Sequence, residues 1–499
     1  MQNKNTFYVI LGLEIMVVLL VAFGLIPREA ALIMSGIMVF YFIFSKMEDG
    51  LILFIASIPI FVALPITESF DSLSAGRIFV LVLFLKWLFS QKQIKFIKMK
   101  RLEILSALLL LVLILSILPA IDKIAAIKKI IYLINLAAIF LIVRDTIKDK
   151  IIFKKAVKAV LISSAIVFLI ALGQLISTYF FTIGSFWDWW ADHFSLGFYG
   201  ENLRQIIKTD NAWFANSPSG PSVIRLFGSF TDPHSFALYL LLTLPFIISL
   251  AITKIKEKFR KEWIWLILTM FFIVLSGTRG IWLGIIFGFL AAIYLLFKKM
   301  NFTRCVSCVL AVLVIFVFLI PIASTFTTIP QFREHAGQSD AALILKRLAS
   351  ILDLDELSNQ GRIYIWKRSL ESFKEHPLLG IGAGNFPVVL GQDIALAKAG
   401  SSAHNLYLNF LVENGLFAFI LIVFMVWEIL SVVFFVLKLN LPQKTRILIT
   451  GLFIYLVWAF GYSLFDIALL DERVFLIFLT ILGMIYAIKN NPEIALKDE

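Results

Sequence analysis

The segments FYVILGLEIMVVLLVAFGLI, at residues 7–26, and LEILSALLLLVLILSILPA, at residues 102–120, decide the fold class. Each approaches the ~20 apolar residues that a helix needs to cross the hydrocarbon core of a bilayer. Lys4 precedes the first segment, and Pro27, Arg28 and Glu29 follow it in place of a small-residue cleavage site. We therefore expect a retained membrane helix and not a removed signal peptide.

The composition of the whole chain agrees with this expectation. Of the 499 residues, 60% are hydrophobic and 16% are charged, and the mean hydropathy is +0.94. Soluble domains are roughly 45–50% apolar and about 25% charged. One core cannot hide such an excess of apolar surface, so much of it must face lipid. The sequence predicts an all-α, polytopic transmembrane helical protein.

Hydropathy predicts about 14 spans, and the charges between them predict the orientation. The candidate spans are at about 7–26, 29–45, 49–66, 77–90, 102–120, 125–143, 158–181, 235–252, 262–277, 280–298, 304–325, 406–437, 447–465 and 472–488. The net charge is +12, but most Lys and Arg lie in short loops between spans, as the positive-inside rule requires, and not on a nucleic-acid-binding face. Both termini are then cytoplasmic, and no nucleic-acid partner is expected.

This topology divides the chain into five parts. We expect N-terminal transmembrane helices at 1–181, a first extracytoplasmic loop at 182–234 and central transmembrane helices at 235–325. A large extracytoplasmic loop with short helices follows at 326–405, and residues 406–499 form the C-terminal transmembrane helices and a cytoplasmic tail. The five histidines of the chain (His193, His234, His335, His376 and His404) all fall on the outer side. The polar chemistry is therefore predicted to lie outside the cytoplasm.

His404 follows Ser401, Ser402 and Ala403 at the start of a span. Ser402 is a candidate N-cap, which would place His404 in the first helical turn, where the helix dipole disfavours an imidazolium. A neutral imidazole is the form that a general base requires. A structural histidine at a helix end is the alternative.

Arg279 occupies a tight turn, Ser276 to Gly280, between two spans at the outer face. Free N–H groups at a helix start suit phosphate oxygens, and a guanidinium adds a permanently charged fork for the same oxygens. The alternative is an arginine that snorkels to the interface.

The second outer loop has two helical patterns, at 340–354 and 361–373. The second places Arg362 near one helix face with Trp366, and Pro377 ends it. The Cys305–Cys308 pair opens an apolar span without a second pair or a nearby histidine. We interpret it as helix packing rather than redox or zinc chemistry.

Four blocks resemble the O-antigen ligase and Wzy-type polymerase family of bacterial surface-polysaccharide enzymes. The blocks are Arg225 to Phe236, the turn Ser276 to Gly280, Gly361 and Arg362 with Trp366, Pro377, Gly380, Gly382 and Gly384, and Ala403, His404 and Asn405 with Glu413 and Gly415. Together they cover about residues 220–430. His234 departs from the pattern, since asparagine is expected after the proline.

The resemblance implies a GT-C-like multispan fold with the active site on the extracytoplasmic face of the bacterial cytoplasmic (inner) membrane. It implies transfer of a glycan from undecaprenyl diphosphate to an acceptor hydroxyl of a glycan, lipid or protein, with inversion and with neither metal nor cofactor. By motif, His404 would be the catalytic base, and Arg279, Arg362 and Arg225 would bind the donor pyrophosphate. The sequence does not separate a ligase from a polymerase.

Three lysines (Lys123, Lys128 and Lys129) lie at the outer end of the sixth span, against the charge rule. They snorkel to membrane lipid headgroups or help to bind phosphate. A polysaccharide-lipid flippase or other transporter is the rival function. It would favour ionisable residues at mid-membrane, for which Glu14, Lys86 and Glu428 are the candidates.

Overall fold

A computed structural model describes residues 4–66, 73–90, 100–209, 213–217, 220–253, 261–298, 303–326, 332, 357–392 and 401–496. The predicted helix at 340–354 and the lysine clusters within 91–99 and 254–260 lie outside the described residues.

Each predicted span coincides with a helix. The long helices are α1 (Lys4–Ala22), α2 (Ala30–Phe44), α3 (Met47–Ser57), α4 (Ala75–Ser90), α5 (Arg101–Leu115), α6 (Lys123–Thr146), α7 (Lys150–Ser177), α11 (Pro233–Thr253), α12 (Lys261–Leu275), α13 (Arg279–Phe297), α14 (Thr303–Phe326), α17 (Leu406–Leu437), α18 (Gln443–Tyr462) and α19 (Glu472–Asn490). Within the described ranges, seven of these (α6, α7, α11, α13, α14, α17 and α18) are long and apolar enough to cross a membrane. An all-α, polytopic protein is confirmed, while the number of about 14 spans stays a prediction.

Some predicted boundaries are wrong, and prolines or lysines explain them. The third span was predicted to reach residue 66, but α3 ends at Ser57 and continues as the short helix η1 (Ile58–Ile60), which contains Pro59. In contrast, α7 begins at Lys150 and not at 158. Its first turns carry lysines, which lower hydropathy without preventing a helix.

The first predicted loop, 182–234, is folded rather than irregular. It contains α8 (Ile183–Trp189), the π-helix η3 (Trp190–Ser195), α9 (Leu196–Tyr199), α10 (Glu201–Thr209) and the antiparallel strands β3 (Phe214–Ser217) and β4 (Gly220–Ile224). A second small antiparallel pair joins β1 (Ala63–Leu64) to β2 (Leu73–Ser74). The remaining helices are α16 (Leu357–Glu375) and the short helices η5 (Phe386–Leu390), η6 (Ala468–Leu470) and η7 (Pro492–Ile494). The all-α prediction missed both strand pairs because such short strands leave no readable alternation.

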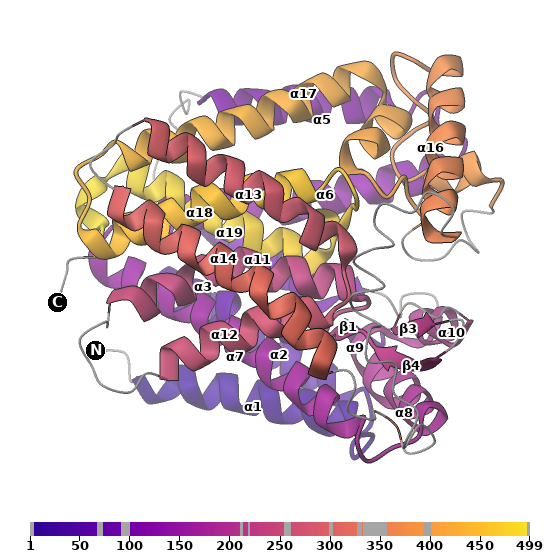
Figure 1. Cartoon of the computed structure of the whole chain (residues 1–499), viewed down its shortest axis with the longest axis horizontal. Helices are drawn as coiled ribbons and strands as arrows, with labels where there is room; N and C mark the ends of the chain where they lie inside the picture. Colours follow the sequence, from indigo (N-terminus) through magenta and orange to yellow (C-terminus); the bar gives the residue numbers. More distant parts are fainter. Residues whose placement is uncertain are drawn as a thin grey trace.

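The long helices run in one direction through the molecule, and the elements between them gather at one end. Figure 1 shows α8, α10, α16 and the pair β3–β4 at this end, with α16 across the helix direction, and both termini at the opposite end. We call the end that carries α8, α10, α16 and the β3–β4 pair the loop end of the bundle. The predicted cytoplasmic location of both termini stays a prediction.

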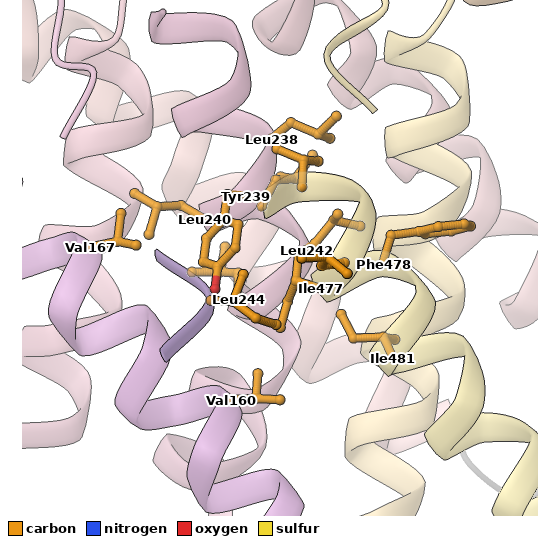
Figure 2. Close-up of a cluster of buried hydrophobic side chains, with 14 of the residues drawn as sticks. Val160, Val167, Leu238, Tyr239, Leu240, Leu242, Leu244, Ile477, Phe478 and Ile481 are labelled. Carbon is orange, nitrogen blue, oxygen red and sulfur yellow. The ribbon is translucent and has the colours of Figure 1, made fainter. Parts of the chain in front are cut away.

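Helix α11 lies at the centre of the bundle. It is apolar all round, the pattern of a buried helix. An apolar stretch of 18 residues in this helix is 94% buried. Figure 2 shows Leu240, Leu242 and Leu244 of α11 between Val160 and Val167 of α7 and the α19 residues Ile477 and Ile481. In lipid, close packing and not hydrophobic transfer holds helices together. This core fixes the position of the α11 N-terminus at the loop end.

Helices α13 and α18 approach closely because α13 presents glycines to large α18 side chains. A methyl group on Gly280 would come within 2.9 Å of Tyr462, and one on Gly284 within 3.0 Å of Trp458. Small residues at a membrane-helix interface permit this close packing. Arg279, the first residue of α13, is thereby held beside the end of α18.

The glycine-rich segment after α16 packs backbone to backbone against α17. Gly382 N donates to Glu413 O (2.8 Å), and Leu416 N donates to Pro377 O (2.9 Å). Helix α17 is kinked at Gly415, whose φ is 77° and where a Cβ would lie 2.0 Å from Leu378 O. Only glycine fits this conformation and contact. Two of the sequence blocks are therefore halves of one contact that fixes α16 to α17.

Candidate functional site

His404 lies at the loop end, immediately before α17. Asn405 is the N-cap of α17, with its side chain accepting from Tyr407 N and Leu408 N, both at 3.0 Å. The predicted cap at Ser402 is therefore wrong, and His404 precedes the first turn. Its φ of 45° turns the chain into the helix, and its backbone N–H donates to Ser402 Oγ (3.2 Å). The dipole argument for a neutral imidazole is weaker at this position.

Asp466 lies opposite His404, in the connection between α18 and α19. Its Oδ2 is 3.5 Å from Nδ1 of His404 and 3.4 Å from Nδ1 of His234, the second residue of α11. A hydrogen bond from Leu406 N to Ser463 O (2.8 Å) ties the start of α17 to the end of α18 and sets this geometry. Three chain segments that are far apart in sequence thus meet at one carboxylate.

The charge of Asp466 is stabilised by its neighbours. Burial opposes ionisation of the carboxyl, but His234, His404 and Arg362 outweigh it and hold the pKa of Asp466 well below its usual range. An ionised carboxylate accepts a hydrogen bond from Nδ1–H of His404, which leaves Nε2 as the basic nitrogen. The arrangement suits a histidine that receives a proton.

His234, which departs from the expected asparagine, is a member of this cluster. Its Nε2 accepts from Arg225 Nη2 (3.3 Å), and its Nδ1 lies 3.1 Å from the Tyr462 hydroxyl. Its backbone N–H donates to Asp232 Oδ1 (2.8 Å) at the start of α11. We call His404, Asp466, His234 and Arg225 the histidine cluster.

One predicted arginine, Arg225, belongs to the histidine cluster, and the other two, Arg279 and Arg362, lie near it. Arg225 donates through Nε to Ser276 O (3.1 Å). Burial lowers the pKa of Arg225 to about 10, and the nearby charge of Arg279 acts in the same direction, so Arg225 stays protonated at neutral pH. Arg279 starts α13, and Arg362 on α16 acts electrostatically on Asp466. All four predicted site residues therefore belong to one neighbourhood.

A cavity of about 960 Å³ opens beside the histidine cluster. His404, His234 and Asp466 line it, together with Asp471 and Arg473 from the start of α19. Apolar side chains of the first loop form another part of the wall: Phe198, Leu203, Ile206, Ile207 and Trp213. The volume and mixed lining suit an amphipathic ligand.

The three predicted arginines are not among the cations that line the cavity. Among the described residues that line it are Lys128 and Lys129 of α6 and Arg77 of α4, whereas Arg225, Arg279 and Arg362 lie outside that lining. The lysines, which the sequence left between snorkelling and phosphate binding, therefore share a cavity with His404. Lys123 is exposed and not part of this lining.

Sequence reasoning missed Asp466. The only available signal was an acidic residue in a short connection between two predicted spans, and nothing local links it to residue 404.

Cys305, as predicted, is a buried packing residue of α14. No group of three or more His, Cys, Asp or Glu side chains arranged to hold a metal occurs in the part of the chain that the structure describes.

Residues 264–423, from α12 into α17, match the family model described as O-Antigen ligase. This segment of the chain is therefore similar to the O-antigen ligase family. The resemblance inferred from the sequence blocks is thereby confirmed, and the matched segment contains Arg279, Arg362 and His404. Comparison with curated proteins gave no match. The match indicates a multi-pass bacterial membrane protein with a glycosyltransferase-like role in polysaccharide assembly, whose substrates are lipid-linked glycan and polysaccharide.

Proposed function

We propose that this protein is an inverting, metal-independent glycosyltransferase of the ligase or polymerase type. It transfers a glycan from undecaprenyl diphosphate to an acceptor hydroxyl. The observation that carries the proposal is the contact of His404 with Asp466 on a large cavity, with three arginines near the pair. The active site then faces the extracytoplasmic side of the bacterial inner membrane.

His404 is the general base of the proposed reaction. Its Nε2 takes the proton of the acceptor hydroxyl as the oxygen bonds to the anomeric carbon, and Asp466 stabilises the imidazolium that forms. The bond from the anomeric carbon to the diphosphate oxygen breaks, and undecaprenyl diphosphate leaves with the electron pair. A positioned base contributes typically 10²–10⁴-fold.

The arginines stabilise the leaving group. Negative charge grows on the diphosphate as the glycosidic bond breaks, and fixed cations aimed at that charge lower the barrier. Arg279 and Arg362 provide this charge, while Arg225 also fixes His234. Attack from the side opposite the leaving group inverts the anomeric configuration.

Two of the three ionisable residues on which a transporter would depend, Glu14 and Lys86, have local roles instead. Glu14 is buried and accepts a hydrogen bond from Ser57, and Lys86 donates to the carbonyl oxygens of Phe42 and Ser45 at the end of α2. These contacts satisfy the hydrogen-bonding needs of individual side chains, and they do not connect Glu14 and Lys86 into a substrate pathway across the membrane. They favour the enzyme over the flippase.

The test is transfer by the purified full chain from an undecaprenyl-diphosphate-linked glycan, without ATP or an ion gradient. Arg279→Ala and Arg362→Ala should each lower the rate at least about tenfold, and lysine should rescue only partly because a point charge does not reproduce the guanidinium fork. Arg368→Ala is the matched control, since Arg368 lies on α16 and pairs with Glu371 at the surface (2.9 Å).

Two results would contradict the proposal. Movement of the intact lipid-linked glycan across a vesicle membrane, without transfer, would indicate a flippase. Wild-type transfer by either arginine-to-alanine variant would remove that residue from the donor site.

A further inference from the structure

A basic patch of the cavity has no role in the proposed transfer step. Arg77 of α4 and Lys129 of α6 both lie against the ring of Tyr132, with Cζ and Nζ at 4.9 Å and 5.2 Å from its centroid. Lys128 precedes Lys129 on the same cavity lining. The Tyr132 hydroxyl donates to Leu470 O (2.8 Å), which fixes the ring. We call Arg77, Lys128 and Lys129 the basic wall.

The described residues offer no hydrogen-bonding partner to the side chains of the two lysines in the basic wall. Among the residues that the structure describes, no acceptor lies within hydrogen-bonding or ion-pairing distance of the ammonium groups of Lys128 and Lys129. Cation–π contact holds one face of an ammonium but leaves its N–H donors unused. A partly buried cation in this state gains from an anionic ligand.

Nearby carboxylates neutralise only part of the basic wall. Glu472 Oε2 pairs with Arg77 Nε at 2.9 Å, and the charge of Glu413 acts on Lys129. Lys128 is exposed and has no such counter-charge among the described residues. An incoming oxyanion therefore meets a net positive charge with several free donors.

The position of the basic wall indicates which substrate brings that oxyanion. A general base must touch the acceptor hydroxyl, so the cavity that His404 lines holds the acceptor. In-line displacement places the leaving diphosphate on the opposite side of the anomeric carbon, toward the arginines outside the cavity lining. This inference rests on the proposed function. It places an anionic group of the acceptor at the basic wall and the donor diphosphate near the arginines.

We propose that the basic wall is a second anion subsite of the cavity and binds a phosphate or carboxylate group carried by the acceptor. Tyr132 adds a flat ring beside the anion, a surface suited to a sugar. The subsite selects anionic acceptors over neutral ones, because each charge-assisted hydrogen bond is worth roughly tenfold or more in affinity.

The test measures binding and needs no turnover. Purified full-length protein is titrated calorimetrically with glucose 6-phosphate, with glucuronic acid and with glucose as the neutral reference. The variants are Lys128→Gln, the double variant Lys128→Gln/Lys129→Gln, and Lys123→Gln as a control. Lys123 has the same charge, starts the same helix and lies outside the cavity lining.

We expect at least one anionic sugar to bind the wild type about tenfold or more tightly than glucose. The sugar that does so identifies phosphate or carboxylate as the preferred group. The double variant should lose this preference, Lys128→Gln should reduce it, and Lys123→Gln should keep it. Because Lys128 is exposed, the single variant tests the subsite even if the double variant does not fold.

Equal binding of all three sugars by the wild type would overturn the proposal. Saturation with undecaprenyl diphosphate provides a second criterion: persistent binding of the anionic sugar supports an acceptor subsite, and its displacement would assign the basic wall to the donor. Failure of glycan transfer in the separate activity assay would contradict the proposed function without altering these titrations.

Discussion

The histidine cluster and the basic wall lie on one cavity, yet they are built differently. In the histidine cluster, Asp466 contacts two imidazoles, and Arg225 is held by Ser276 O and by His234. In the basic wall, the two lysine ammonium groups have no acceptor among the described residues. The side chains of the histidine cluster are held in place before any ligand binds. The ammonium groups of the basic wall need a ligand to provide hydrogen-bond acceptors.

The helices beside these two sets differ in burial only in part, because α17, which follows His404, is peripheral like α6, with 33% of its apolar stretch buried. The 18-residue apolar stretches of α11 and α18 are 94% and 89% buried, whereas that of α6 is 39% buried. Reaction chemistry requires positions held to within a fraction of an ångström, and the closely packed α11 and α18 provide them for His234 and Asp466. A peripheral helix that faces lipid over much of its surface suits recognition of a variable substrate group.

The largest effect should come from removing His404 from the histidine cluster. His404→Ala should lower the transfer rate by about 10²–10⁴-fold, the usual contribution of a general base, with little change in donor binding, which we assign to the arginines. His404→Gln keeps hydrogen bonding without useful basicity. Steady-state rates and donor titration measure both properties, and near-normal activity of His404→Gln would limit this residue to positioning substrate.

A smaller effect should follow when Asp466 loses its charge. Asp466→Asn should slow transfer at least about tenfold, the worth of one charge-assisted hydrogen bond. The acidic limb of the pH–rate profile should move to lower pH, because a neutral amide no longer stabilises the imidazolium of His404. A slower enzyme with an unshifted profile would mean that Asp466 only supports the fold.

The smallest effect concerns Asp471, which lies between the two sets. Burial raises the pKa of Asp471 to about 7, and the charges of Asp232 and Glu472 act in the same direction. An unfolded aspartate titrates near 3.9. From about pH 4 to 7 the folded state therefore binds a proton that the unfolded state has lost, and stability falls as pH rises through this window.

Asp471→Asn keeps the N-cap acceptor of α19 but removes this titration. The melting temperature of the variant minus that of the wild type should be more positive at pH 8 than at pH 4. Asp149→Asn, at the exposed N-cap of α7, is the control. An equal difference between Asp471→Asn and wild type at both pH values would contradict the prediction.

The sequence predicted much of the site because several of its residues stand in local patterns. Arg279 lies in a tight turn between apolar spans, and His404 lies at the start of another, so hydropathy alone places both at helix ends. Asp466 and His234 show no such pattern. Their importance arises from distances across α11, α17 and α18 that no periodicity encodes.

The sequence by itself determined the membrane class and the approximate helix positions, because length and hydropathy of a span are local properties set by the thickness of the bilayer. It also indicated the resemblance to O-antigen ligases that the match of residues 264–423 confirms. Only the tertiary structure decided that Asp466 faces two histidines and that Lys128 and Lys129 share the His404 cavity. The physical reason is that packing of large side chains against glycines, and backbone contacts such as that at Gly415, set how helices meet, and these depend on residues hundreds of positions apart.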